Sequence, residues 1–431
     1  MSITKLKIVA VVNTEFTNTF DTLYREASLR NDLEFIFVVI PLRLEGSFKY
    51  SIPMQKIEKM MERKNYSFIK GYNPVSDSYL DLKELSPDAV FLQSPYDVHR
   101  YSPLYSSYYI SSFAACYHIS YGCSLLDYDK PPYDFLVRNF QPSCIILNEN
   151  SMLANYLNKY HKNVPIGYLK CDKYLNYVND NYFFKLNRPK YKTILCWKPR
   201  WVGTLGDSNF IRYIDFFLDY TAHHKDTLLY IVMHDFFEEE ITKRRQIYTK
   251  KEYQRLLQKI DSIKNIKIIA HDDFLDYVFA SDIFIGDYCS TILEFFLSKK
   301  PVIYCPTEVY FSDFGKQVST GFYTVSNISE LKDTIEQLVI KKIDPLKPIR
   351  ENLVGLVSDK HEGYTIAQYL INYLINNVEF DKKYCRNFAS NHKNSTESRS
   401  KNNISKLSIK NKIRYFIWRY LNKKLKEKHI I

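Results

Sequence analysis

Apolar runs of strand length alternate with stretches of helical spacing along most of the chain. Near the start, the β-branched runs "KLKIVAVVN" and "LEFIFVVIP" flank an amphipathic stretch over residues 20–30. Similar runs continue to about residue 168, and a second series begins at "KTILCW" and ends at "PVIYC". Strands that alternate with helices predict parallel sheets with helices on both faces.

The two series predict an α/β fold with two doubly wound, Rossmann-like domains that face each other across a cleft. A length of 431 residues also favours more than one domain. We expect an N-terminal domain over 1–172, a linker over 173–191, a C-terminal domain over 192–375, a polar linker over 376–403 and a basic helix over 404–431. In such sheets ligands bind beyond the carboxyl ends of the strands.

The composition excludes several classes of protein. An aromatic content of 16% excludes wholesale disorder, and eight scattered cysteines without CxxC pairs favour reduced thiols over disulfides or a zinc site. The longest apolar run at the N-terminus is too short for a signal peptide, and no window approaches the length of a membrane span. We therefore expect a cytoplasmic protein.

The net charge of +12 is concentrated at the C-terminus, because residues 401–431 hold ten Lys or Arg and one acid. No nucleic-acid-binding motif accompanies this charge, so we expect no nucleic-acid partner. One helical face of this tail is apolar: Ile409, Ile413, Phe416, Ile417 and Tyr420. A basic amphipathic helix is typical of a segment that binds an anionic membrane surface. The alternative is a helix that packs on the body of the protein.

The stretch "GDYCSTILEFFLS" begins at the end of one apolar run and continues into a helical pattern. Ser290 and Thr291 would lie where the predicted strand 283–286 gives way to the predicted helix 291–298. Hydroxyl groups and free amides at such a position suit a phosphate. The pattern from Thr291 to Glu294 also fits a capping box, which needs no ligand.

Two further stretches place polar side chains at strand ends in the same domain. His234 ends the predicted strand 228–234, and Lys198 and Arg200 follow the strand 192–197. Each residue alone is compatible with a structural or solvated role. Because parallel strands have their carboxyl ends at one edge of the sheet, the three together predict a site for a phosphorylated, nucleotide-like donor.

Several segments resemble the CDP-glycerol glycerophosphotransferase family, which makes teichoic-acid-like and capsular polymers. "VPIGYLKCDKYL" is similar to its "GYPKLD" segment, "ILCWKPRW" to "W-x-P-H", and "SDIFIGDYCSTILEFFLSKKPVIYC" to "SDxxITDYSSxxFDYxxxxKPxIxY". The resemblance is dense over about 164–340. It implies a metal-independent GT-B transferase without a cofactor, whose C-terminal domain binds the donor through these residues: Lys198, Arg200, His234, Asp287, Ser290, Thr291 and Glu294.

The chain departs from the family pattern at several positions. Cys289 replaces the first serine of "DYSS", Arg200 stands where histidine is common, and Leu169 replaces a proline. The "HGTPxK" histidine, which the family uses as its base, has no clean counterpart. His118 in "CYHISYG" is the nearest candidate and His99 the next, and both also fit ordinary structural histidines.

The reaction that the resemblance implies is transfer of glycerol phosphate, or a related alditol phosphate, from a CDP-activated donor to an acceptor hydroxyl. The expected partners are this donor, a lipid-linked polymer or saccharide acceptor, and the inner face of the membrane. His118 and His234 are the candidate catalytic residues. Two alternatives stay open: a GT-B glycosyltransferase that uses a nucleotide sugar, and a non-catalytic partner that binds nucleotide or polymer.

Overall fold

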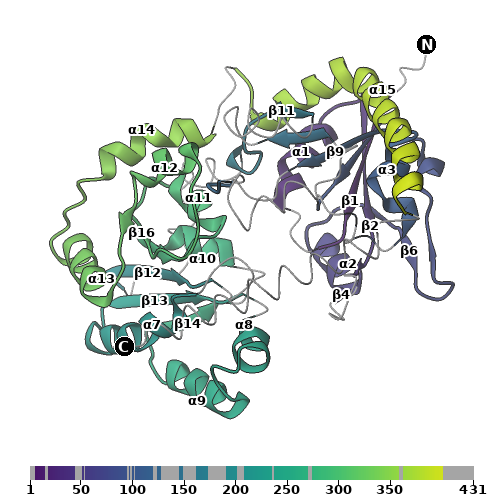
Figure 1. The fold of residues 1–431 in the computed structure, drawn as a ribbon. Helices are drawn as coiled ribbons and strands as arrows, with labels where there is room; N and C mark the ends of the chain where they lie inside the picture. The colour runs from purple at the N-terminus through teal and green to yellow at the C-terminus, as the bar shows by residue number, and fades with distance from the viewer. Residues whose placement is uncertain are drawn as a thin grey trace.

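The computed structural model contains two α/β domains that lie side by side (Figure 1). It describes residues 5–14, 18–43, 51–52, 54–94, 97, 100, 102–119, 124–127, 145–148, 162–172, 191–200, 208–234, 237–269, 274–358 and 363–400. His99, most of the predicted linker over 173–191 and the predicted basic helix over 404–431 lie outside these residues.

The N-terminal domain is built on a seven-stranded sheet in which every neighbouring pair is parallel. Its strands stand in the order β11 (Asn163–Pro165), β10 (Ile145–Asn148), β9 (Ala115–Ile119), β8 (Ala89–Leu92), β1 (Leu6–Val12), β2 (Leu33–Val39) and β5 (Phe68–Lys70). The helices α1 (Asn18–Ser28), α2 (Met54–Arg63) and α3 (Ser107–Ser111) accompany it. β8 and β9 are buried throughout, as expected of strands that helices cover on both faces.

The C-terminal domain has a six-stranded parallel sheet with the Rossmann strand order. The order is β14 (Ile266–Ile269), β13 (Thr227–Val232), β12 (Thr193–Lys198), β15 (Ile283–Gly286), β16 (Val302–Tyr304) and β17 (Tyr323–Thr324). Alternate residues of β12 enter different cores: Ile194 and Cys196 belong to one cluster, Leu195 and Trp197 to the other. The prediction of two doubly wound domains is therefore confirmed.

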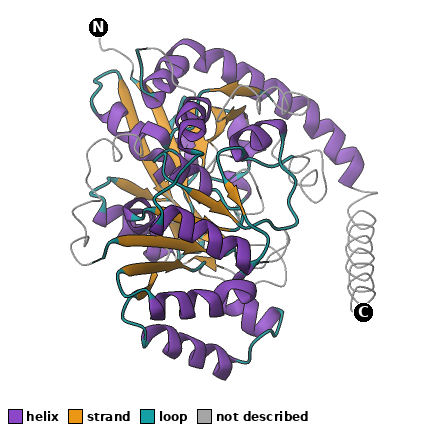
Figure 2. Ribbon diagram, turned by 90° about the vertical axis from the view of Figure 1, so that its left-hand side faces the viewer, coloured by secondary structure: helices purple, strands orange, loops and turns teal. Residues whose placement is uncertain are grey.

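Helices cover both faces of this second sheet (Figure 2). The cluster around Trp197 includes residues of α7 (Phe210–His223), α9 (Lys250–Asp261) and α13 (Ile328–Ile335). The opposite cluster includes residues of α10 (Phe274–Ala280), α11 (Thr291–Phe296), α12 (Asp313–Ser319) and α14 (Lys347–Ser358). Between β13 and α9 lie the short helix α8 (Phe237–Glu239) and a π-helical turn, Glu240–Arg244.

The C-terminal part of the described chain corrects the predicted boundaries. Instead of a domain end at 375 and a polar linker over 376–403, the helix α15 runs continuously over Ile366–Ser400 and lies on the N-terminal domain (Figure 1). Its apolar residues keep helical spacing: Leu370, Ile371, Leu374, Val378 and Cys385 are all buried. The polar composition of residues 376–403 is the reason that the sequence predicted a linker there instead of this helix.

The buried carboxylate of Asp381 anchors α15 on the N-terminal sheet. It accepts hydrogen bonds from the hydroxyls of Tyr117 (2.7 Å) and Tyr373 (2.9 Å), and it pairs with the ammonium of Lys162. At the start of α15, Asp172 accepts the amides of Ile366 (2.9 Å) and Ala367 (2.8 Å). These bonds satisfy amides that a helix leaves unpaired.

Residues 124–127, which belong to the N-terminal half, dock on the C-terminal domain. The carbonyl of Leu125 accepts the amide of Ser312 (2.8 Å), and the amide of Asp127 donates to the carbonyl of Tyr310 (2.9 Å). A Cβ at Gly315 would lie 2.1 Å from the Leu125 carbonyl oxygen, so only glycine fits there. The hydroxyl of Tyr288 accepts the Leu125 amide at 3.2 Å. The two halves therefore meet directly beside the loop that follows β15.

Candidate functional site

Polar residues gather where the strand order of the C-terminal sheet reverses, between β12 and β15. Lys198 and Gly286 are register partners at the carboxyl ends of these strands. A Cβ on Gly286 would lie 2.8 Å from the Lys198 carbonyl oxygen, so a side chain there would push the strand ends apart. In open parallel sheets this reversal point is where ligands bind.

Asp287, directly after β15, holds the loop that follows β12. Its carboxylate is fully buried and accepts the amides of Arg200 (2.8 Å) and Asn209 (3.0 Å), together with the Asn209 side-chain amide (2.9 Å). Burial raises the pKa of Asp287 above its ordinary value, and these hydrogen bonds oppose the rise. Asp287 was predicted to contact the donor, but its hydrogen bonds go to the protein and place Arg200.

We expect Asp287→Ala to lower the free energy of unfolding by about 3 kcal/mol, because several buried donors lose their acceptor together. Urea denaturation of both proteins measures the difference. Asp282→Ala is the control, since Asp282 is partly exposed and accepts the Ile194 amide at 2.9 Å at the opposite edge of the sheet. A loss near 1 kcal/mol is expected there. Equal losses in the two variants would contradict the special role of Asp287.

The hydroxyl-rich loop ends in a short helix without a side-chain cap. Ser290 stands at the N-cap of α11 in helical conformation, and its side chain makes no capping hydrogen bond. The capping box that the spacing from Thr291 to Glu294 would also fit, as the alternative to a phosphate site, is not formed. Since α11 has only six residues, its dipole contributes little, and any phosphate contact at this end rests on the side chains and local amides.

His234, two residues beyond β13, lies near both cations of the neighbouring strand end. Burial, together with the positive charges of Lys198 and Arg200 acting in the same direction, lowers its pKa to about 3. His234 is consequently neutral near pH 7. Lys198 and Arg200 are themselves buried, and the Lys198 ammonium lies 4.6 Å from the centre of the Phe274 ring. The three predicted side chains do gather at one edge of the sheet.

Glu294 points away from this loop, toward the N-terminal half. One of its carboxylate oxygens, Oε1, accepts the Tyr168 hydroxyl at 2.8 Å and the Lys170 ammonium at 2.8 Å. All three residues are buried. The family resemblance predicted that Glu294 contacts the donor. In the structure its carboxylate instead forms an ion pair that connects the two halves.

The carboxyl edge of the N-terminal sheet carries His118 near the end of β9. Its Nδ1 lies 3.1 Å from the carbonyl oxygen of Leu92. Because a carbonyl only accepts hydrogen bonds, Nδ1 carries the proton and Nε2 keeps a free lone pair. Burial is the main cause that lowers the His118 pKa to about 4, and the positive charge of Arg100 adds to it. A neutral imidazole with a fixed tautomer is suited to act as a base.

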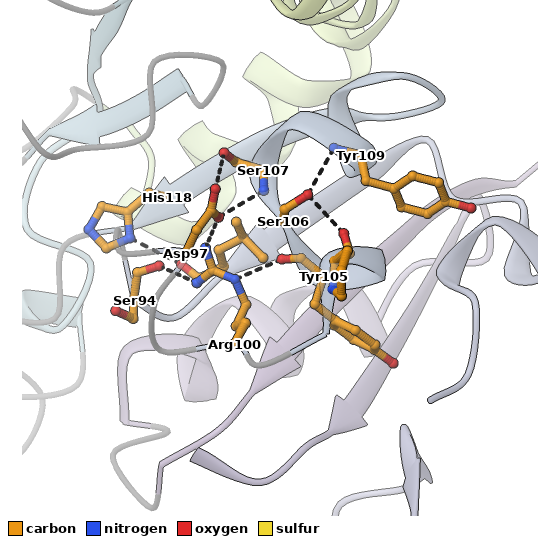
Figure 3. Close-up of polar contacts among 10 residues, drawn as sticks. Ser94, Asp97, Arg100, Tyr105, Ser106, Ser107, Tyr109 and His118 are labelled. Atoms are coloured by element: carbon orange, nitrogen blue, oxygen red, sulfur yellow. Dashed lines mark hydrogen bonds and ion pairs between the residues drawn. The ribbon is translucent and has the colours of Figure 1, made fainter. Parts of the chain in front are cut away.

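A buried arginine organises the loop beside His118, and the sequence patterns did not reveal it (Figure 3). Arg100 donates to the carbonyls of Tyr105 and Ser94, both at 2.8 Å, and to the Asp97 carboxylate at 2.6 Å. Asp97 in turn accepts the amide of Ser107 at 2.8 Å. The sequence feature that could have indicated this ion pair is the spacing of Asp97 and Arg100, three residues apart in "YDVHR".

No group of three or more His, Cys, Asp or Glu that could hold a metal occurs among the described residues. Within the same residues, no helix is both long and apolar enough to cross a membrane. The cysteines placed in the structure are free thiols: Cys116, Cys171, Cys196, Cys289, Cys305 and Cys385.

No family model matches the chain, and no curated protein sequence matches it. Solved structures do match. The UDP-GlcNAc 2-epimerase of Neisseria meningitidis bound to UDP-GlcNAc is 11% identical with a TM-score of 0.57, covering 86% of this chain and 100% of that one. MnaA of S. aureus in a co-structure with UDP is 15% identical with a TM-score of 0.55, covering 86% and 97%.

The wall teichoic acid polymerase TagF is a further match, with 12% identity and a TM-score of 0.51, covering 87% of this chain and 89% of that one. At these identities the likeness shows the fold alone. The chain therefore has the GT-B arrangement of two Rossmann-like domains, as the sequence predicted.

Proposed function

We propose that this protein transfers glycerol phosphate, or a related alditol phosphate, from a CDP-activated donor to an acceptor hydroxyl during synthesis of a teichoic-acid-like or capsular polymer. The observation that carries the proposal is the cluster at the reversal point of the C-terminal sheet. There Lys198, Arg200 and His234 are buried or half-buried together, and Ser290 and Thr291 follow the adjacent strand. Such a set of donors suits a diphosphate.

The similar solved structures support a nucleotide-activated donor. Two of them contain UDP or UDP-GlcNAc, and the third is a wall teichoic acid polymerase. The segments that resemble the glycerophosphotransferase family include the loops that form the cluster, which favours the CDP-activated donor among these possibilities.

In the proposed reaction, His118 is the base on the acceptor side. Its Nε2 accepts the proton of the acceptor hydroxyl while the hydroxyl oxygen attacks the donor's β-phosphorus. Ser124, six residues after His118, has its hydroxyl 3.5 Å from that of Tyr288 in the donor-side loop. Six residues span at most about 20 Å, which sets an upper limit on the distance between His118 and the Ser124–Tyr288 contact.

The bond between the β-phosphorus and the bridging oxygen breaks, and CMP leaves with the added negative charge. Lys198 and Arg200 supply positive charge at that position, and His234 supplies a neutral N–H donor because its pKa lies near 3. A bound phosphate would raise the His234 pKa again, since it opposes the charges that lower it. The products are the lengthened polymer and CMP.

The second candidate function is a glycosyltransferase that uses a nucleotide sugar. The observation that favours it is the presence of UDP or UDP-GlcNAc in two of the similar structures. The same cluster of Lys198, Arg200 and His234 would then stabilise a departing UDP. Acceptor and base would keep their roles.

We further propose that the protein works at the inner face of the cell membrane on a lipid-linked acceptor. The support is the basic amphipathic pattern over 404–431, with ten Lys or Arg and one acid over 401–431. The donor is soluble, so the acceptor is the partner that requires a bilayer.

The test is to incubate the protein with CDP-glycerol, CDP-ribitol and common nucleotide sugars and to measure released nucleotide. We expect turnover of a CDP-alditol and release of CMP. His234→Ala should lower this turnover about 100-fold, the scale for loss of one preorganised donor. His223→Ala is the matched control, because that histidine is 71% exposed at the end of α7 and should leave turnover unchanged.

Three other outcomes would contradict the proposed donor, the proposed catalysis or the proposed role of His234. Turnover of a nucleotide sugar supports the glycosyltransferase, and binding without turnover of any donor supports a non-catalytic partner. A His234→Ala protein that melts earlier but keeps its activity per folded molecule assigns His234 a purely structural role.

A further inference from the structure

Among the residues that the structure describes, three buried carboxylates are each satisfied by a lysine and at least one tyrosine hydroxyl. They are those of Asp21 with Lys64 and Tyr66, of Asp381 with Lys162, Tyr117 and Tyr373, and of Glu294 with Lys170 and Tyr168. The first lies within the N-terminal domain, and the second attaches α15 to it. The third connects the N-terminal half with α11 of the donor-side domain.

The Glu294 cluster is well removed from solvent. The side chain of Glu294 is 3% exposed and that of Lys170 is 11% exposed. Two residues after Lys170, Asp172 accepts the first amides of α15. Residues 168–172 therefore tie together α11, α15 and the end of the N-terminal sheet.

A buried ion pair is a poor means of adding stability, because desolvation of the charges offsets most of their attraction. Apolar side chains of the same size would hold the two halves about as firmly. Hydrogen bonds to a carboxylate are directional. They therefore fix both the rotation of the helix that carries it and the position of that helix along its axis. Glu294 lies one helical turn beyond Ser290 and Thr291, so its position sets theirs.

We propose that Lys170 and Tyr168 are positioning residues for the donor site. Acting through Glu294, they hold α11 in the one orientation that presents Ser290 and Thr291 to the donor phosphates. The N-terminal half thereby sets the affinity of the other half for nucleotide. This inference rests on the proposed function, because it requires that the cluster beside α11 bind a nucleotide.

The experiment separates positioning from stability with paired apolar substitutions. The double variant Lys170→Met/Glu294→Met replaces both charges with side chains of similar size and should melt within a few degrees of the natural protein. We expect its affinity for CDP and UDP, measured by titration calorimetry, to fall about tenfold. With the donor that the turnover assay identifies, the KM for that donor should also rise about tenfold, while kcat should change less than threefold. Lys170→Met alone should melt earlier, because it leaves a buried charge unpaired.

The Asp21 cluster provides the matched control, because it has the same chemistry within one domain. Lys64→Met/Asp21→Leu should leave affinity for CDP and UDP unchanged. Tyr168→Phe removes one hydroxyl and keeps the ion pair, so it should fold normally and bind about threefold more weakly.

Natural affinity in both the Lys170→Met/Glu294→Met and Tyr168→Phe variants would overturn the inference. If the double variant does not fold, Tyr168→Phe alone decides. Failure of the natural protein to bind either nucleotide would instead overturn the proposed function.

Discussion

Replacing His118 with asparagine is expected to lower turnover about 1000-fold while the protein stays folded. The side-chain amide of asparagine can occupy the place of Nδ1 and still donate to the Leu92 carbonyl, which now lies 3.1 Å from Nδ1. The lone pair on Nε2 is lost, and with it the base, whose contribution is typically 10²–10⁴-fold. Steady-state turnover with the identified donor, compared with melting temperature, measures both effects.

The pH dependence distinguishes this role from a structural one. In the folded protein, burial holds the His118 pKa near 4, so kcat/KM should fall only as the pH drops through about 4, well below the ordinary histidine value of 6.5. His223→Asn, on the exposed end of α7, serves as control and should not alter the profile. Full activity in His118→Asn would remove His118 from the mechanism and leave the base to be sought elsewhere.

The same pKa predicts the stability of the fold in acid. The unfolded chain binds a proton near pH 6.5 and the folded chain only near pH 4, so between these values the unfolded state binds more protons. Stability is therefore retained above pH 6.5 and lost progressively as the pH falls to 4, by about 3 kcal/mol for this one group. The His118→Asn protein should be less sensitive to acid over the same interval.

The fold was predictable because both sheets are parallel and their strands are buried on two faces. Residues such as Ile194 to Trp197 then read as continuous apolar runs, which are easy to find, and the carboxyl ends of those runs mark the ligand-binding edge. The predicted grouping of Lys198, Arg200 and His234 followed from this geometry alone.

What could not be predicted depends on contacts between residues far apart in sequence. Glu294 and Thr291 have the spacing of a capping box, yet Glu294 finds better partners in Tyr168 and Lys170, more than 120 positions earlier. Local spacing carries no information about such a partner. This ion pair joins two of the segments that resemble the family, one on each side of the predicted linker.

At α15 the sequence predicted a polar linker where the structure has a helix. The overall polar composition of this segment made its regularly spaced apolar residues hard to recognise. Asp381 would ordinarily mark a solvated position, but two tyrosine hydroxyls and a lysine make its burial possible. A chain with 37 tyrosines has many such hydroxyls available. Buried carboxylates in this protein are therefore poor indicators of a catalytic site unless their partners are known.

Removal of residues 401–431 is expected to abolish binding to anionic vesicles. Each basic residue near such a surface contributes about 1 kcal/mol, so engagement of five of the ten would change the partition by roughly 10³- to 10⁴-fold. The tail follows directly on α15, which the Asp381 cluster fixes to the N-terminal domain. Membrane binding through the tail would therefore attach the N-terminal domain to the bilayer through α15.

Sedimentation with vesicles that contain anionic lipid, at low and at physiological salt, measures this binding. Salt should weaken it, because charges are screened over about 8 Å at physiological ionic strength. The matched control is Lys250→Gln/Lys251→Gln/Arg255→Gln on the exposed surface of α9, which lowers the net charge in the donor-side domain and should leave binding intact. The truncated protein should keep its activity on a short soluble acceptor and lose it on the lipid-linked one. Continued sedimentation after truncation, or unfolding, would make the tail a structural helix of the body.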